Sequence, residues 1–116
     1  MTLLFSSVSP AARKPGEMPP PRLMAPGDLV ETGPSGVEFR WGNESGGNID
    51  HYDFHLYLGP QTYEKDLILK KEIPRGTSSI WIESSYFKPG ETYSWSLRTN
   101  GSKRSMFARS VFKIKK

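Results

Sequence analysis

The chain has 116 residues, with ten prolines, eleven glycines, no cysteine and a formal net charge of +4 at pH 7. This length allows one small domain with a single core, and the many turn-forming residues argue against long helices. The absence of cysteine excludes a stabilising disulfide. No stretch approaches the roughly 20 apolar residues of a membrane-spanning helix.

Residues 1–21 differ from the rest of the chain. They are rich in proline and almost without apolar pattern, which predicts a disordered leader or linker. The apolar stretch from Thr2 to Val8 and the small residues up to Ala12 faintly resemble a signal-peptide remnant. No basic segment precedes that stretch, so a plain linker is the alternative. Residues 22–116 remain for the folded domain, a length sufficient for a single core.

The apolar pattern after residue 22 predicts strands, because apolar residues recur at every second position. A first strand is broken by Pro26, which is tolerated at a sheet edge, and a second runs from Val37 to Trp41. After a glycine-rich loop at 42–48, the third strand has the longest alternation in the chain. Its predicted inward side chains are Tyr52, Phe54, Leu56 and Leu58, and its outward ones are Asp53, His55 and Tyr57.

Residues 65–73 predict a fourth strand at a sheet edge, where consecutive lysines discourage pairing with another molecule. In the fifth strand, Ile80 and Ile82 point inward, so Trp81 is expected to point outward. A last strand follows the loop after Asn100, and its inward side chains are Phe112 and Ile114.

The stretch from Phe87 to Leu97 combines a turn with a sixth strand. Pro89 and Gly90 form the turn, after which Tyr93, Trp95 and Leu97 recur at every second position. A tyrosine directly after such a corner is typical of immunoglobulin-like sandwiches, in which its hydroxyl bonds back to the preceding chain.

Two motifs resemble those of fibronectin type III domains. The first spans the passage from the second to the third strand and consists of Trp41, Gly46, Gly47, Ile49 and Tyr52. The second is the corner at 87–93, followed by Trp95 in the Y-x-W variant of bacterial members. The resemblance covers residues 22–116 and implies an all-β, seven-stranded antiparallel, immunoglobulin-like sandwich.

This resemblance implies a role rather than a reaction. Such domains are mostly non-catalytic structural, adhesion or binding modules of secreted, periplasmic or cell-surface proteins. We expect a monomer without a cofactor that contacts a protein, a glycan or a neighbouring domain. The predicted contact residues on the outward face of the third and sixth strands are Asp53, His55, Tyr57, Ser96 and Arg98. Trp81 is a separate candidate, because exposed tryptophans are favoured binding anchors.

Basic residues are concentrated at the C-terminal end of the chain. Residues 98–116 contain seven basic residues and no acidic one, whereas residues 23–97 contain six basic and eleven acidic residues. The alternative function is therefore an anion-binding module for an acidic polysaccharide or nucleic acid. Lysines that protect an edge strand explain the same charges. This basic strip consists of Arg98, Lys103, Arg104, Arg109, Lys113, Lys115 and Lys116.

The nearest approach to a catalytic or metal site is the triplet His51, Asp53 and His55, which share one face of the third strand. At about 3.3 Å per residue, the two histidines start about 13 Å apart, which disfavours a single shared ion. No serine lies in a G-x-S-x-G elbow. We expect no enzyme activity, and a hydrolase or metal site on this strand is the least favoured alternative.

Overall fold

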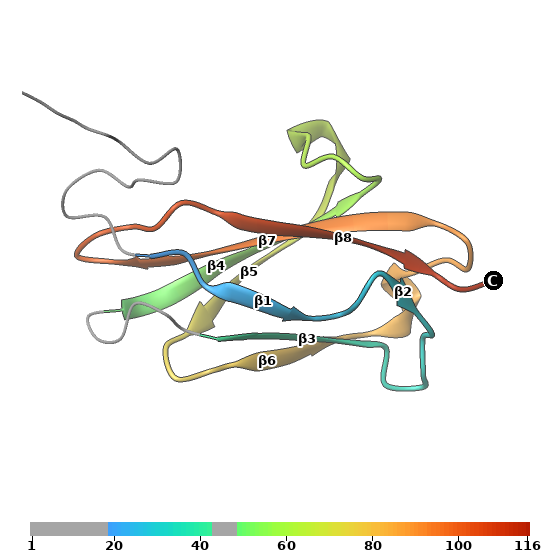
Figure 1. Ribbon diagram of the computed structural model, residues 1–116, viewed down its shortest axis with the longest axis horizontal. Helices are drawn as coiled ribbons and strands as arrows, with labels where there is room; N and C mark the ends of the chain where they lie inside the picture. The colour runs from blue at the N-terminus through green and yellow to red at the C-terminus, as the bar shows by residue number, and fades with distance from the viewer. Residues whose placement is uncertain (1–18, 43–48) are drawn as a thin grey trace, which may run out of the picture.

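The computed structural model of the chain describes residues 19–42 and 49–116, which form β-strands and two short 3-10 turns (Figure 1). Most of the predicted leader and of the glycine-rich loop lies outside the described residues. The elements are β1 (Arg22–Ala25), β2 (Leu29–Val30), β3 (Val37–Gly42), β4 (Ile49–Leu58), η2 (Glu64–Asp66), β5 (Leu67–Pro74), β6 (Ser79–Ile82), η3 (Ser84–Tyr86), β7 (Thr92–Gly101) and β8 (Ala108–Ile114).

The strands form two sheets. One has the order β1-β3-β6 and the other the order β2-β8-β7-β4-β5, which confirms the predicted all-β class and the edge position of β5. Seven antiparallel strands were predicted, whereas the described residues form eight strands. In addition, β2 runs parallel to β8. The break at Pro26 explains the difference, because β1 and β2 join different sheets on either side of it.

The two sheets face each other across a core of aromatic side chains. Phe39 of β3 lies at its centre, with ring centroids 5.2 Å from Phe54, 4.9 Å from Trp95 and 5.6 Å from Phe112, all on the opposite sheet. The alternating inward residues of the predicted strands are therefore the ones that pack together. Trp41 and Trp95 are 2% and 0% exposed, as expected from their positions in the alternation.

One predicted core residue lies outside this core. Leu58 continues the inward alternation of β4, but its side chain is 44% exposed. It is the last residue of the strand, and it lines a surface hollow with Ile68, Tyr86 and Tyr93 instead of joining the core. The alternation predicted which way the residue points but not where the core ends.

The corner before β7 has the predicted hydrogen bond. The backbone N–H of Lys88 donates to the Tyr93 hydroxyl at 2.8 Å, and the Tyr93 ring packs against Phe87 and Phe112. Gly90 adopts a φ of 83°, which only glycine adopts readily. No helix among residues 19–42 and 49–116 has the length and apolar character needed to cross a membrane.

Candidate functional site

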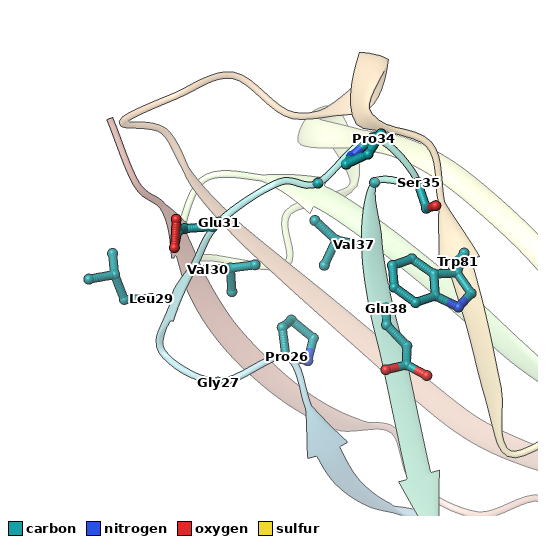
Figure 2. Close-up of a pocket in the computed structure, with 12 residues that line it drawn as sticks. Pro26, Gly27, Leu29, Val30, Glu31, Pro34, Ser35, Val37, Glu38 and Trp81 are labelled. Carbon is teal, nitrogen blue, oxygen red and sulfur yellow. The ribbon is translucent and has the colours of Figure 1, made fainter.

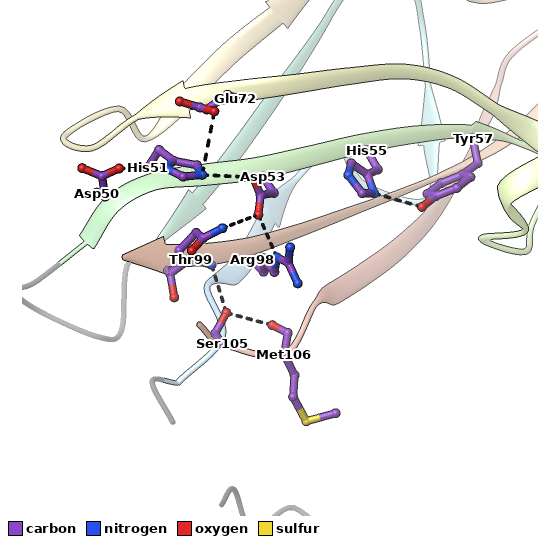
Figure 3. Close-up of polar contacts among 11 residues, drawn as sticks. Asp50, His51, Asp53, His55, Tyr57, Glu72, Arg98, Thr99, Ser105 and Met106 are labelled. Carbon is purple, nitrogen blue, oxygen red and sulfur yellow. Dashed lines mark hydrogen bonds and ion pairs between the residues drawn. The ribbon is translucent and has the colours of Figure 1, made fainter. Parts of the chain in front are cut away.

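The outward face of the five-stranded sheet brings the predicted contact residues together (Figure 3). In the pairing of β4 with β7, Asp53 lies opposite Arg98 and His55 lies opposite Ser96. Tyr57 follows on the same face, because side chains two residues apart in a strand point the same way. The structure therefore confirms that these five residues share one face.

Asp53 is the centre of a polar network on this face. Its Oδ2 accepts hydrogen bonds from Arg98 Nε at 2.7 Å and from Asn100 Nδ2 at 3.0 Å. Burial alone would raise the pKa of Asp53, but these two bonds and the positive charge of Arg98 outweigh it and lower that pKa. The carboxylate is therefore ionised and internally paired, which leaves it little capacity to bind a partner.

The other side of Arg98 is covered by Phe107, which the sequence analysis did not single out. The guanidinium carbon lies 4.6 Å from the Phe107 ring centroid, and the His55 ring lies 5.0 Å from the same centroid. Phe107 belongs to the loop between β7 and β8, so its contact with β4 depends on the loop conformation. The adjacent apolar residues Met106 and Phe107, at the end of a polar loop, were the available signal.

A buried serine holds this loop in place. Ser105 is 5% exposed, and its hydroxyl accepts a 2.9 Å hydrogen bond from the Thr99 backbone and donates one of 2.9 Å to the Met106 carbonyl. The Ser105 backbone N–H also donates to the Thr99 carbonyl at 3.1 Å. These three bonds fix the position from which Phe107 reaches Arg98.

Two of the predicted contact residues are covered rather than exposed. Tyr57 is 8% and Ser96 4% exposed, although both point outward from the sheet. The segment after β4 crosses this face, where Ser94 Oγ donates to the Gln61 carbonyl at 3.2 Å and Arg109 Nη2 donates to the Pro60 carbonyl at 2.6 Å. The expectation of an open outward face is therefore wrong at these two positions, because strand alternation cannot predict which loop folds over a sheet.

The histidines of β4 occupy two separate environments. His55 Nδ1 lies 3.1 Å from the Tyr57 hydroxyl, and burial, followed by the charges of Lys70 and Arg98, lowers the pKa of His55. His51 Nδ1 lies 3.1 Å from Asp50, and its Nε2 lies 3.2 Å from Asp53. The hydrogen bond to Asp50 is the main cause that raises the pKa of His51.

This arrangement does not bring His51, Asp53 and His55 to one point. His51 contacts carboxylates with both ring nitrogens, whereas His55 turns toward Tyr57. Within the described ranges, no group of three or more histidine, aspartate or glutamate side chains is arranged to hold a metal ion. His51 therefore lies in a cluster of carboxylates, formed by Asp50 and Asp53 on its own strand and by Glu72 of β5, whose Oε1 lies 4.0 Å from His51 Nε2.

The basic strip does not form one continuous patch. Arg98 is paired with Asp53, and Arg109 is bonded to the Pro60 carbonyl. Lys103 and Arg104 lie in the loop before β8, whereas the last lysines follow its far end, and Figure 1 shows these two regions at opposite ends of the sheet. The exposed basic residues of the strip are Lys103, Arg104, Arg109, Lys113, Lys115 and Lys116.

Trp81 is the predicted contact residue that the structure leaves most open. Its side chain is 56% exposed, whereas the next residue, Ile82, is 2% exposed, so the predicted orientation of this strand is confirmed. Trp81 lies opposite Glu38 in the pairing of β3 with β6. It borders a hollow of about 520 Å³ between the segment 26–38 and β6, which we call the Trp81 groove (Figure 2).

The turn before β3 gives the Trp81 groove its shape. Gly36 has a φ of 95°, and a Cβ at this position would collide with the backbone carbonyl of Ile82. The absence of a side chain therefore lets the 33–36 turn approach the strand that carries Trp81. The sequence predicted the outward tryptophan, but not that β2 and this turn would enclose a space beside it.

Comparisons of the chain with models of known protein families and with curated proteins find no match.

Proposed function

We propose that this chain is a non-catalytic interaction module with a sandwich of the fibronectin type III class. The packing of a three-stranded against a five-stranded sheet and the hydrogen bond from the Lys88 backbone to Tyr93 support this class. From the motif resemblance, we propose that the domain belongs to a secreted, periplasmic or cell-surface protein. In this proposal the domain acts as a monomer that contacts a protein, a glycan or a neighbouring domain.

The observation that carries the proposal is the exposed Trp81. A tryptophan that is 56% exposed on a strand, beside a hollow, keeps a large apolar surface in water, and burial of such surface favours binding. The strand also fixes the backbone that carries the indole, since the neighbouring residue Ile82 is anchored in the core. By contrast, the polar groups around Asp53 and Arg98 already bind one another.

A selection of displayed peptides tests this proposal. A library is selected for binding to the full chain alone, and each selected peptide is then titrated against the wild type and against the Trp81→Ala variant, whose fold is verified by circular dichroism. The proposal predicts peptides that bind the wild type and lose at least about tenfold in affinity with Trp81→Ala, as expected for a tryptophan anchor. Binders that are insensitive to this substitution, selected repeatedly, would contradict the assignment of Trp81 as the contact.

A second candidate function is the binding of a polyanion. It is favoured by the exposure of Lys113, Lys115 and Lys116 at one end of β8, in a segment without acidic residues. Titration with an acidic polysaccharide at two salt concentrations tests it, because affinity from neutralised charges falls steeply with salt. Binding that is salt-sensitive and unaffected by Trp81→Ala would favour this candidate over the first.

A further inference from the structure

We propose that the Trp81 groove recognises a basic side chain, lysine or arginine, presented by a peptide partner. This inference rests on the proposed interaction function and specifies the chemistry of its ligand. The positive group would lie against the Trp81 indole beside the Glu38 carboxylate.

The first argument is the position of Trp81 relative to Glu38. They are directly opposite on neighbouring antiparallel strands, so their Cβ atoms are about 4.5 to 5.5 Å apart. Figure 2 shows both side chains on the same side of β3. An indole face attracts a cation through its quadrupole, and an adjacent carboxylate adds a charge of the opposite sign.

The second argument is the charge of the Trp81 groove. Among the described residues that line it, the ionisable side chains are Glu31 and Glu38. Glu31 Oε1 lies 3.8 Å from Lys115 Nζ, in an exposed pair outside the lining, so Glu38 is the carboxylate that faces Trp81. The same lining includes proline and valine side chains, of which Val37 is 2% exposed. An acidic hollow with apolar walls suits the long aliphatic stem and charged end of lysine or arginine, and it disfavours an anionic ligand.

The third argument is that Glu38 is held only weakly by the protein itself. Arg40 Nε lies 3.6 Å from Glu38 Oε1, and the two side chains are 51% and 35% exposed. Exposed ion pairs of this kind contribute little. A ligand cation can therefore replace Arg40 as the partner of Glu38, and Arg40 acts as an internal competitor.

The test uses two peptides that differ only in charge. Acetyl-Gly-Lys-Gly-amide is titrated into the full ¹⁵N-labelled chain, and the peptide with norleucine in place of lysine is the control, since it keeps the apolar stem. The readout is the indole N–H signal of Trp81. The indole signals of Trp41 and Trp95 are internal references, because these side chains are only 2% and 0% exposed.

We expect a saturable shift of the Trp81 signal with the lysine peptide and a response at least about threefold weaker with norleucine. Glu38→Gln should weaken lysine binding by about threefold or more, whereas Arg40→Gln should strengthen it by removing the competitor. Glu64→Gln, an exposed substitution on η2, is the matched control and should change nothing. All of these substitutions are at exposed or half-exposed side chains, so the variants should remain folded.

Equal binding of the lysine and norleucine peptides would overturn the inference, as would a lysine affinity that Glu38→Gln leaves unchanged. Failure of both peptides to shift the Trp81 signal would overturn it as well. The proposed function has its own test, because displayed peptides that depend on Trp81 but show no preference for lysine or arginine would support that function and contradict this inference.

Discussion

The Tyr93 hydroxyl accepts a hydrogen bond of 2.8 Å from the Lys88 backbone N–H, and this bond joins the corner at 87–91 to the start of β7. Tyr93 itself is 2% exposed and packs against Phe112 of β8. One side chain therefore contributes both to the core and to the geometry of the turn.

Replacing Tyr93 with phenylalanine should lower the free energy of unfolding by about 1 to 2 kcal/mol, because the part-buried Lys88 N–H loses its acceptor. Urea unfolding monitored by tryptophan fluorescence measures the effect. Tyr63→Phe is the matched control, since Tyr63 is 56% exposed and its substitution should change stability by less than about 0.5 kcal/mol. An unchanged urea midpoint for Tyr93→Phe would contradict the structural role of this hydroxyl.

Three glycine substitutions separate backbone strain from steric collision. Gly36→Ala should be the most destabilising, by about 2 kcal/mol or more, because its positive φ is combined with a collision against the Ile82 carbonyl. Gly76 also has a positive φ, of 86°, but open space around it, so Gly76→Ala should cost about 1 kcal/mol. Gly27→Ala meets no neighbour and should be close to neutral. Equal losses of stability for Gly36→Ala and Gly76→Ala would show that the 33–36 turn does not press against β6.

The two histidines of β4 should titrate on opposite sides of the ordinary histidine pKa of about 6.5, with His51 above and His55 below it. For His51, the protonated ring is favoured in the folded state. Its contribution to the free energy of unfolding is therefore complete below pH 6.5 and is lost as the pH rises through its raised folded pKa. For His55, the neutral ring is favoured in the folded state, so stability is lost as the pH falls from about 6.5 through its lowered pKa. Proton NMR titration of the ring signals measures both values.

Single substitutions should separate these two contributions. In His51→Gln, the decline of stability above pH 6.5 should disappear, and in His55→Gln the decline below it should disappear, as measured by urea unfolding at several pH values. Two histidines that titrate together near 6.5 would show that neither the carboxylates around His51 nor the burial of His55 acts as described.

Ser105→Ala should release the loop between β7 and β8. The substitution leaves the buried Thr99 N–H without its 2.9 Å acceptor, which should cost about 1 to 3 kcal/mol. Hydrogen exchange of the Thr99 amide should accelerate, and the His55 ring signals should shift as Phe107 moves. Ser102→Ala, at an exposed position of the same loop, is the control and should leave both readouts unchanged.

The strand alternation predicted the parts of the fold that depend on local pattern. It predicted the inward aromatic residues of β3 and β7 and the outward direction of Trp81, because each of these follows from a period of two residues. The corner at Tyr93 was predicted from the turn-forming residues Pro89 and Gly90. It also placed Asp53 and Arg98 on one face, although their pairing at 2.7 Å depends on the register between β4 and β7.

The features that sequence analysis missed arise from contacts between distant segments. Tyr57 and Ser96 are buried on the outward face, and on the same face the segment around Pro60 folds back to bind Ser94 and Arg109. The parallel pairing of β2 with β8 and the division of the basic strip likewise depend on topology. Apolar alternation carries no information on which strands pair or on where a loop lies, so these features required the three-dimensional structure.

The central claim is that the domain binds its partner through Trp81. The most direct measurement is a ¹⁵N–¹H chemical-shift map of the full chain with a peptide from the display selection. We predict that the Trp81 indole signal and the backbone amides of Ser35 and Glu38 shift, while the buried Trp41 and Trp95 indoles do not. Shifts confined to the face around Asp53 and Arg98, or to residues 103–116, would contradict the claim.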